Sequence, residues 1–219
     1  MPAPAVVMAS RNPGKLRELR DLLKDTGLKL LSLEDFPELG EIPETGVTFA
    51  ENAAHKALEV ARLTGLPALA DDSGLEVAAL GGRPGVYAAR YAQDRTRPGA
   101  PSDADNWRKL LEELREVPRE QRGARFVCEI ALAFPDGRLF RARGECQGQI
   151  ALAPQGSQGF GYDPVFWVPA YGATMAELGP QIKNRISHRA RALAALRELL
   201  LTLEEDLSRC QQPSAAAAE

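Results

Sequence analysis

The sequence predicts an α/β fold that forms one compact unit. Short apolar segments typical of strands alternate along the chain with longer segments in which leucines and alanines recur at helical spacing. The pattern contains no internal repeat and no linker, and 44% of the 219 residues are hydrophobic, which is enough to fill a sizeable core. We therefore expect a single domain over residues 1–209, followed by a disordered tail at residues 210–219.

The first third of the chain is expected to alternate strands and helices. The helix with the clearest start opens at Thr48-Phe-Ala-Glu51, which fits a capping box. Residues 34–46 are acidic and contain two prolines, so a loop is expected there. The expected strands cover residues 6–9, 28–33 and 66–70, and the expected helices cover residues 15–24 and 49–64.

The rest of the chain continues the mixture of helices and strands. Ser102 or Asp103 is expected to cap one helix, and Ser187 is expected to cap the last one. Residues 126–134 alternate apolar and other side chains, which is typical of a strand, and Pro135-Asp-Gly137 suits a hairpin turn. The remaining expectations are a second hairpin strand over 139–144, a helix start within 75–80, and loops over 81–85 and 156–161.

Composition and charge argue against several classes of protein. The formal net charge is −3 at pH 7, so the chain has no global basic field that would attract nucleic acid. No stretch approaches about eighteen uncharged apolar residues, which argues against a membrane span. The three cysteines are odd in number and widely spaced, which suits neither a disulfide framework nor a zinc site. A reducing cytoplasm is therefore the expected location.

The most informative segment is Leu69-Ala-Asp-Asp-Ser-Gly-Leu75, where an apolar run ends in two adjacent carboxylates. Adjacent acids repel each other, so a fold gains nothing from them unless a cation or a proton relay lies nearby. A metal-assisted site needs carboxylates on rigid backbone, next to a glycine that lets a ligand approach. The alternative is a strand that ends in a solvated turn, and this segment alone leaves both interpretations open.

Residues Ser10-Arg-Asn-Pro-Gly-Lys15 lie between an expected strand and an expected helix. Backbone amides at a helix start, with the helix dipole behind them, can bind an anion, and Lys15 adds a full positive charge. The segment is not a Walker A motif, because Ala9 stands where that motif has its first glycine and Leu16 follows the lysine. An ordinary strand-to-helix turn with Pro13 in the first helical turn is the alternative.

Two later segments carry further candidates. Residues 183–191 form a dense cationic patch before and at a helix start, where positive charge opposes the helix dipole unless a bound anion relieves the conflict. A solvated basic face is the alternative. Residues 159–163 place aromatic rings between flexible glycines, where a ring can stack on a planar base, and the alternative is a hydrophobic anchor for the loop. A phosphate cradle, an acidic metal site, a stacking loop and a polar base reader together point to nucleotide chemistry.

With these segments assembled, the chain resembles the inosine triphosphate pyrophosphatase family. The matching segments occur in the family's order, and the ordered set is highly specific although each segment is modest alone. Ser10 stands where the family often has threonine, a change that keeps the hydroxyl. The matching segments are Ser10-Arg-Asn-Pro-Gly-Lys15, Thr45-Gly-Val-Thr-Phe-Ala-Glu-Asn52, Ala70-Asp-Asp-Ser-Gly-Leu75, Gly81-Gly-Arg-Pro-Gly-Val-Tyr87, Phe160-Gly-Tyr-Asp163 and Ser187-His-Arg189.

The resemblance implies an elongated mixed β-sheet flanked by helices, with two lobes around a central substrate cleft, usually in a homodimer. It implies a hydrolase that uses Mg²⁺ to convert inosine, deoxyinosine and xanthosine triphosphates (ITP, dITP and XTP) to the monophosphate and pyrophosphate. The role would be to cleanse the nucleotide pool of deaminated purines. The alternatives are a pyrophosphatase for other modified nucleotides, including pyrimidines, and a nucleotide-binding regulator without turnover.

Residue by residue, the resemblance implies that Asp72 is the proton acceptor and a metal ligand, with Lys15 assisting catalysis. A further acid before Thr45 usually helps to bind metal in the family. Glu44 is the expected ligand, and Glu41 is the alternative because that loop varies in length. The residues expected to contact substrate are Ser10, Arg11, Asn12, Pro13, Gly14, Lys15, Ser73, Phe160, Gly161, Tyr162, Asp163, Lys183, His188 and Arg189.

The expected selectivity has a simple physical basis. Hypoxanthine and xanthine carry a carbonyl oxygen where adenine carries an amino group. Donors from His188 or Arg189 would pair with that oxygen and would lose their partner when adenine is bound. Guanine shares the carbonyl oxygen, so its exclusion requires a further contact near its 2-amino group.

Overall fold

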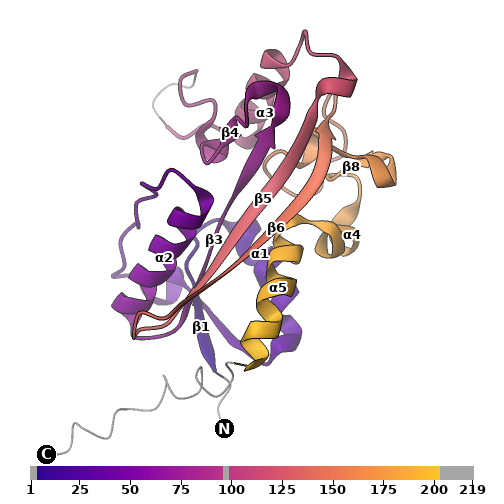
Figure 1. The fold of residues 1–219 in the computed structure, drawn as a ribbon. Helices are drawn as coiled ribbons and strands as arrows, with labels where there is room; N and C mark the ends of the chain where they lie inside the picture. The colour runs from indigo at the N-terminus through magenta and orange to yellow at the C-terminus, as the bar shows by residue number, and fades with distance from the viewer. Residues whose placement is uncertain (1–3, 96–98, 203–219) are drawn as a thin grey trace, which may run out of the picture. The chain divides into compact units, whose positions relative to one another are not determined.

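The computed structural model describes residues 4–95 and 99–202, and it confirms the predicted α/β class. The described residues form a mixed eight-stranded sheet and five α-helices (Figure 1). The strands are β1 Ala5–Met8, β2 Lys29–Ser32, β3 Ala68–Val77, β4 Pro84–Gly85, β5 Gly123–Ala133, β6 Leu139–Ile150, β7 Phe166–Val168 and β8 Ala173–Thr174. The helices are α1 Pro13–Leu23, α2 Phe49–Thr64, α3 Asp103–Glu113, α4 Gly179–Ile186 and α5 His188–Thr202.

The sheet mixes parallel and antiparallel neighbours. Its hydrogen-bonded strands follow the order β2-β1-β3-β5-β6-β7-β8, and β4 pairs with β3. Strand β1 is parallel to both β2 and β3, whereas β4, β7 and β8 pair with their neighbours in antiparallel fashion. Parallel neighbours need a crossover connection, and α1 and α2 supply it. The expected hairpin turn after β5 is confirmed, because the Gly137 amide donates to the Phe134 carbonyl at 3.0 Å.

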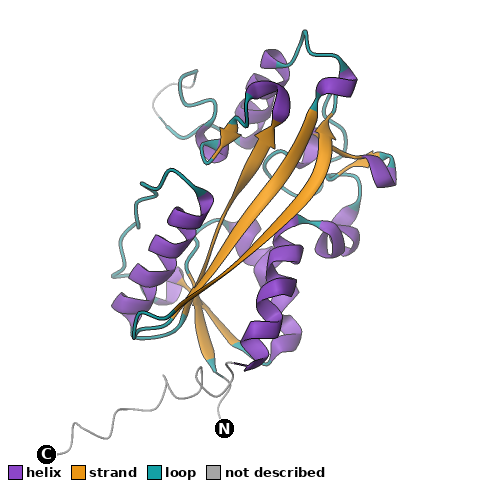
Figure 2. Cartoon of the chain, in the orientation of Figure 1, coloured by secondary structure: helices purple, strands orange, loops and turns teal. Residues whose placement is uncertain are grey.

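Two compact units share these elements. Unit 1 comprises the described parts of Met1–Asp71, Glu129–Ala142 and Leu193–Glu219, and unit 2 comprises those of Asp72–Cys128 and Arg143–Ala192. The long strands β3, β5 and β6, which are among the strands coloured orange in Figure 2, each have residues in both units. Strand β3 passes from unit 1 to unit 2 between the two adjacent acids singled out in the sequence.

Unit 1 packs small side chains of α2 against its strands. Ala53, Ala57, Val60 and Ala61 recur at helical spacing and are almost completely buried. They share one hydrophobic cluster with apolar residues of β1, β3 and β5, including Val7. Because most of these helix side chains end at Cβ, the helix backbone lies close to the strands. This packing holds α2 against the strand that carries Asp71.

The helix starts follow local capping signals that the sequence displays. Thr48 Oγ1 accepts from the Glu51 amide at 3.2 Å, and the Glu51 carboxylate accepts from the Thr48 amide, so the capping box of α2 is confirmed. Ser102 caps α3, and Ser187 Oγ accepts from the Ala190 amide at the start of α5. A cap depends only on residues a few positions apart, which makes it predictable from sequence.

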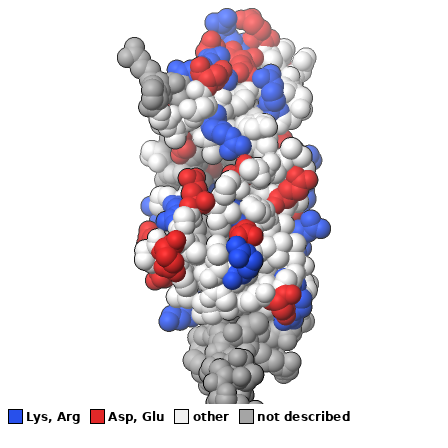
Figure 3. All heavy atoms as spheres, turned by 90° about the vertical axis from the view of Figure 1, so that its left-hand side faces the viewer, with Lys and Arg blue, Asp and Glu red and all other residues white. Residues whose placement is uncertain are grey.

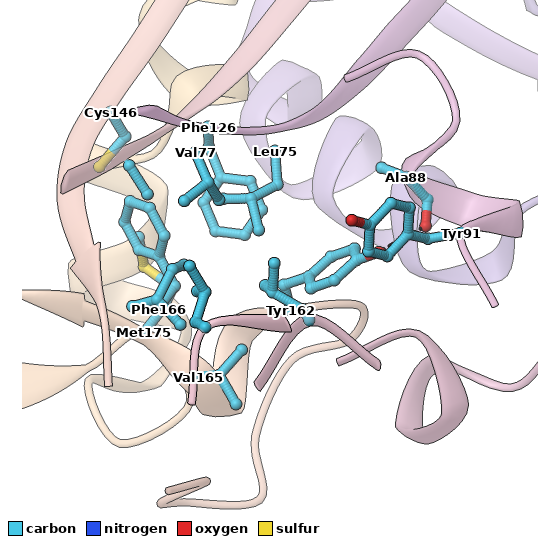
Figure 4. Packing of buried hydrophobic residues seen from close by; sticks show 14 of the residues in the cluster. Leu75, Val77, Ala88, Tyr91, Phe126, Cys146, Tyr162, Val165, Phe166 and Met175 are labelled. Carbon is cyan, nitrogen blue, oxygen red and sulfur yellow. Dashed lines mark hydrogen bonds between the residues drawn. The ribbon is translucent and has the colours of Figure 1, made fainter. Parts of the chain in front are cut away.

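Unit 2 has a hydrophobic core of its own (Figure 4). Alternate residues of the strands face it, such as Leu75 and Val77 of β3, as the two-residue period of a strand requires. The rings of Phe126 and Phe166 lie 4.3 Å apart in this core. Further members of the cluster are Ala88, Tyr91, Leu110, Leu114, Ala124, Cys146, Ile150, Tyr162, Val165, Val168 and Met175.

Two expectations around the adjacent acids were wrong. Strand β3 runs without interruption from Ala68 to Val77, beyond the expected end at residue 70, so of the two open interpretations the turn at residues 71–74 is excluded. A 3₁₀ helix rather than an α-helix follows at Ala78–Leu80. Asp, Ser and Gly favour turns and are poor strand formers when judged locally. The segment is nevertheless flanked by pairing, since Leu69 lies opposite β1 and Leu75 lies opposite β4. This pairing overrides the local preference.

Helix α4 was not anticipated, because its eight residues offer too short an apolar repeat to reveal a helix. The sequence predicts a single cationic patch over residues 183–191, before and at a helix start. Lys183 and Arg185 instead occupy the last turn of α4, where the helix dipole favours positive charge. The expected tail at residues 210–219 lies outside the described residues, and the expected two-lobed cleft stays a prediction.

Charged side chains of both signs are interspersed on the face drawn in Figure 3. A mixed surface of this kind creates little field of one sign over a wide area, in keeping with the small net charge of −3. Over residues 4–95 and 99–202, no helix combines the length and the apolar character that a membrane span needs.

The core of unit 2 gives a first testable prediction. Phe166 has no exposed surface and packs against Phe126, so Phe166→Ala should lower the free energy of unfolding by about 3–5 kcal/mol. Urea denaturation followed by circular dichroism measures this loss. Tyr171→Ala is the control, because Tyr171 is 43% exposed in the same unit and its loss should cost less than about 1 kcal/mol. Equal losses in the two variants would contradict the placement of Phe166.

Candidate active site

Asp71 has the most buried side chain among the acids of the site, and lysines from two helices reach it within unit 1. Its side chain has no exposed surface, and Lys15 Nζ of α1 lies 3.2 Å from its Oδ1. Lys56 Nζ of α2 donates to the Asp71 carbonyl at 2.9 Å and to Glu44 Oε1 at 2.6 Å. A buried carboxylate needs a nearby cation because its desolvation is costly. These contacts join α1, α2 and the loop before α2 at one residue of β3.

The turn before α1 is organised by the side chain of Asn12. Its Oδ1 accepts from the Gly14 amide at 2.9 Å and from the Lys15 amide at 3.1 Å, and Ser10 Oγ accepts from the Asn12 amide at 3.2 Å. The cap therefore occupies two amides that an anion would otherwise use. The positive charge that this turn offers to a ligand is the Lys15 ammonium group, reinforced by the dipole of α1.

Arg11 and Pro13 of the same turn fix the path of the backbone. Arg11 Nη2 donates to the Leu39 carbonyl at 2.6 Å, which ties the turn to the loop after β2. Pro13 occupies the first position of α1, where its missing amide removes no helical hydrogen bond. Both residues fix the path of the chain into α1 and so fix the point from which Lys15 extends.

Asp72 and Ser73 follow on the same strand and belong to unit 2. Asp72 is 5% exposed, and its Oδ1 accepts from the Ser73 amide at 3.0 Å. Successive side chains of a strand point to opposite faces, which separates the carboxylates of Asp71 and Asp72 although the residues are neighbours. Arg189 Nη2 of α5, itself 1% exposed, donates to Ser73 Oγ at 2.9 Å. The strand thus presents a carboxylate beside a hydroxyl that is bonded to a buried guanidinium group.

The loop at residues 159–163 holds another buried carboxylate of the site. Asp163 Oδ2 accepts from the Phe160 amide at 3.0 Å and pairs with the Lys183 ammonium group of α4. Lys183 Nζ lies 4.8 Å from the centroid of the Phe160 ring, and the guanidinium carbon of Arg189 lies 5.8 Å from it. Both distances are within the range of a cation–π contact. Four predicted site residues are therefore brought together in unit 2.

The side chain of Tyr162 lies in the core of unit 2. It points toward Ala88 and Tyr91 (Figure 4), and its hydroxyl donates to the Ala88 carbonyl at 2.8 Å. Burial raises the pKa of this phenol well above its usual range. Tyr162 therefore matches the second interpretation of this loop, a hydrophobic anchor, because its side chain is directed into the core. Gly159 is needed nearby, because a Cβ there would lie 2.0 Å from the Asp163 carboxylate.

His188 is the first residue of α5, and its ring stacks on Phe126 with the centroids 4.8 Å apart. The helix start is packed tightly against β6. A Cβ on Gly144 would lie 2.1 Å from the His188 carbonyl oxygen and 2.3 Å from the Ala192 amide nitrogen. Only glycine allows this contact, and the contact sets the position of the helical turn that carries His188 and Arg189.

The donor set suits a hard divalent cation in part. Over residues 4–95 and 99–202, no three His, Cys, Asp or Glu side chains cluster as a metal site. Asp72 and Glu44, the expected ligands, supply carboxylate oxygens, which Mg²⁺ prefers and usually combines with water and substrate phosphates. Glu44 is held by its ion pair with Lys56, the lysine that also binds the Asp71 carbonyl.

Lys56 was missed by the sequence analysis, although a signal was present. The buried stripe of α2 contains Ala53, Ala57 and Val60, and Lys56 lies on the same helical face. A lysine at a position that the helical spacing assigns to the core needs a partner for its charge. Here the partners are Glu44 and the carbonyl of Asp71.

The chain is similar to known proteins over most of its length. The model of the Ham1 family matches residues 6–199. A protein of Geobacter sulfurreducens named dITP/XTP pyrophosphatase is 53% identical over 195 residues, which cover 89% of this chain and 96% of that protein. A protein of Thermus thermophilus with the same name is 52% identical over 193 residues, which cover 88% of this chain and 90% of that protein.

Solved structures are similar as well. A HAM1 protein from Coxiella burnetii aligns with a TM-score of 0.80 at 44% identity, covering 90% of this chain and 98% of that one. The nucleoside-triphosphatase / dITP/XTP pyrophosphatase from Mycobacterium abscessus aligns with a TM-score of 0.71 at 47% identity, covering 88% of this chain and 98% of that one. The mixed α/β fold is therefore shared with proteins of known structure.

The contact between β6 and α5 gives a second prediction. Gly144→Ala forces a Cβ into the backbone of α5, so it should lower the free energy of unfolding by about 1–3 kcal/mol. Gly123→Ala is the matched control, because Gly123 lies on β5 of the same unit and a Cβ there meets nothing within 4 Å. Ala should be neutral there or stabilising by up to about 1 kcal/mol. Urea denaturation compares the two, and a neutral Gly144→Ala variant would contradict the close contact.

Proposed function

This chain belongs to the Ham1 family, and from that premise we propose that it hydrolyses nucleoside triphosphates of deaminated purines to the monophosphate and pyrophosphate. The relatives named dITP/XTP pyrophosphatase, which are more than half identical to it over nearly the whole domain, support dITP and XTP as substrates, with ITP as the ribose counterpart of dITP. The observation that carries the proposal is the convergence of Lys15 and Lys56 on Asp71, directly before Asp72 on β3.

Cations and a carboxylate are what hydrolysis of a phosphoric anhydride requires. The ammonium group of Lys15 neutralises phosphate oxygens and the charge that develops on the departing pyrophosphate. The hydroxyl of Ser10 and the amide group of Asn12 add neutral donors at the same turn. Lys56 neutralises Glu44 and orients the Asp71 carbonyl, which keeps the strand in place around Asp72.

The proposed reaction is attack of water on the α-phosphorus, with cleavage of the bond from that phosphorus to the oxygen bridging it to the β-phosphorus. Asp72 accepts the proton of the attacking water, and pyrophosphate leaves with the electron pair of the broken bond. The ordinary pKa of an aspartate, about 3.9, makes it a weak base toward free water. Asp72 therefore needs a water molecule whose own pKa is lowered.

Mg²⁺ is the proposed cofactor, held by carboxylate oxygens of Asp72 and Glu44, with Glu41 as the alternative to Glu44. When bound, the ion supplies charge neutralisation on the phosphates and lowers the pKa of coordinated water. The support from the chain itself is the chemistry of the donors, since carboxylate oxygens are hard ligands.

The base end of the substrate is assigned to unit 2. Phe160, Asp163, Lys183 and Arg189 lie within contact of one another there. Buried donors such as Lys183 and the first turn of α5 suit a ring with a carbonyl oxygen at position 6, and they meet the amino group of adenine unfavourably. Ser73, His188 and the backbone at Gly161 and Tyr162 complete the proposed contact set.

We further propose that the enzyme is a cytoplasmic homodimer whose substrate is the free nucleotide rather than a nucleic acid. The cysteine pattern supports a reducing compartment, and the net charge of −3 supports a small substrate over a polyanion. The homodimer rests on the family resemblance, and sedimentation of the purified chain measures it directly.

A third prediction separates the two adjacent acids. Asp72→Asn removes the proton acceptor, so kcat for ITP should fall by about 10²–10⁴-fold at saturating Mg²⁺ while the protein stays folded. Pyrophosphate release measures the loss of kcat. Urea denaturation measures whether the variant keeps its stability. Near-native turnover of Asp72→Asn would remove Asp72 from the catalytic role.

Asp71→Asn is the matched comparison, because the two residues are neighbours and the change is the same. Its carboxylate is buried against Lys15, so its loss leaves a cation without its partner and should lower the free energy of unfolding by about 3 kcal/mol. The two variants should thus differ in kind, one losing mainly turnover and the other mainly stability.

A fourth prediction concerns substrate and product. With ITP and Mg²⁺ the products should be the monophosphate and pyrophosphate, not the diphosphate and orthophosphate. The value of kcat/KM for ATP should be lower than that for ITP by at least about 100-fold, because buried donors lose their partner on adenine. Parallel assays for pyrophosphate and orthophosphate measure both. Comparable kcat/KM values for ATP and ITP would contradict the assignment of the base site.

A further inference from the structure

Two carboxylates hold consecutive amides of the loop at residues 159–163. Asp163, from the loop itself, accepts from the Phe160 amide at 3.0 Å. Asp103, the first residue of α3, accepts from the Gly161 amide at 2.6 Å across a separation of 58 residues. Hydrogen bonds from an amide to an ionised carboxylate are stronger than those between neutral groups. Both contacts lie within unit 2.

Asp103 is not needed to cap its own helix. Ser102 Oγ accepts from the Asp105 amide, and the Asp105 carboxylate accepts from both the amide and the hydroxyl of Ser102. This capping box satisfies the helix start without Asp103. The Asp103 carboxylate, on an exposed residue, is instead directed at Gly161.

We infer that Asp103 is a positioning residue for the nucleoside end of the substrate, an inference that rests on the proposed assignment of this loop to the base. Gly159 and Gly161 both adopt positive φ, at +83° and +63°, and glycine leaves such a segment many alternative conformations. Phe160 lies between the two anchored amides, so anchoring them restricts where its ring points. The loop is thereby ordered before the substrate arrives, so binding does not lose the conformational entropy of ordering it.

Helix α3 is a suitable anchor because it is itself firmly held. Leu110 in the helix and Leu114 directly after it have no exposed surface. Asn106 accepts from the Ala92 amide at 2.8 Å and donates to the Ala89 carbonyl at 3.1 Å. The turn at residues 88–92 that Asn106 holds is also the one whose Ala88 carbonyl accepts the Tyr162 hydroxyl. The loop is thus tied to α3 directly through Asp103 and indirectly through this turn.

The test compares Asp103→Ala with Asp105→Ala in the full chain. Isothermal titration measures the Kd of inosine monophosphate, which carries the nucleoside, and of inorganic pyrophosphate, which lacks it. Asp103→Ala should raise the Kd of inosine monophosphate by about tenfold, which is the effect of losing one charge-assisted hydrogen bond. The Kd of pyrophosphate should stay unchanged. Asp105→Ala should lower Tm through the lost capping box and leave both Kd values unchanged.

Two further measurements separate positioning from general damage. Asp103→Asn keeps an oxygen that can accept from Gly161, so it should restore the Kd of inosine monophosphate to within about threefold of the native value. Hydrogen exchange at the Gly161 amide should be faster in Asp103→Ala than in the native protein, and it should keep its native rate in Asp105→Ala. In steady-state assays with ITP, the Asp103→Ala change should appear mainly in KM, with kcat retained.

Asp163→Asn distinguishes failure of this inference from failure of the proposed base site. If Asp163→Asn leaves the Kd of inosine monophosphate unchanged, the assignment of the loop to the base is overturned, and the inference falls with it. If Asp163→Asn raises the Kd of inosine monophosphate but Asp103→Ala does not, the inference alone is overturned. The inference is likewise overturned if Asp105→Ala raises this Kd as much as Asp103→Ala does.

Discussion

Asp71 carries a carboxylate with no exposed surface, and Lys15 and Lys56 both reach this residue. A buried carboxylate without a cation would be too costly to keep ionised. Lys15, from the first turn of α1, supplies that cation, and Lys56, from the buried face of α2, donates to the backbone carbonyl of the same residue. Glu44 is drawn into the same arrangement through Lys56. Asp71 is therefore the residue at which α1, α2 and the loop before α2 meet within unit 1.

The strand geometry explains how two adjacent acids can have different tasks. In an extended strand, neighbouring side chains point to opposite faces, so the Asp71 carboxylate can be buried beside Lys15 while Asp72 faces elsewhere. A turn, which the sequence favours locally, would not guarantee this separation. Asp72 accepts from the Ser73 amide, and Ser73 in turn binds Arg189. The strand therefore connects an acid whose role is structural to one that the proposed function assigns to chemistry.

The features that sequence analysis predicted correctly are those that short stretches of chain determine. The capping box Thr48–Glu51 and the cap at Ser187 need only residues a few positions apart. The failures have the opposite character. Strand β3 continues through residues 71–74 because β1 pairs with it just before this segment and β4 just after it. Lys56 becomes a site residue because its partners come from other elements. Asp103 resembles an ordinary acid in a first helical turn until its partner, 58 residues away, is known.

Each unit contains a lysine–aspartate pair with a buried carboxylate, half-buried Lys15 with Asp71 in unit 1 and buried Lys183 with Asp163 in unit 2. Such pairs add little net stability compared with apolar side chains of similar size, because each buried charge loses its hydration. Stability alone therefore gives no reason for either pair. A charged and hydrogen-bonding substrate does give one, since each pair places an ammonium group, held in a fixed direction, at a position that the proposed function assigns to ligand. In unit 1 the ligand would be a polyphosphate, and in unit 2 the acceptor edge of a purine.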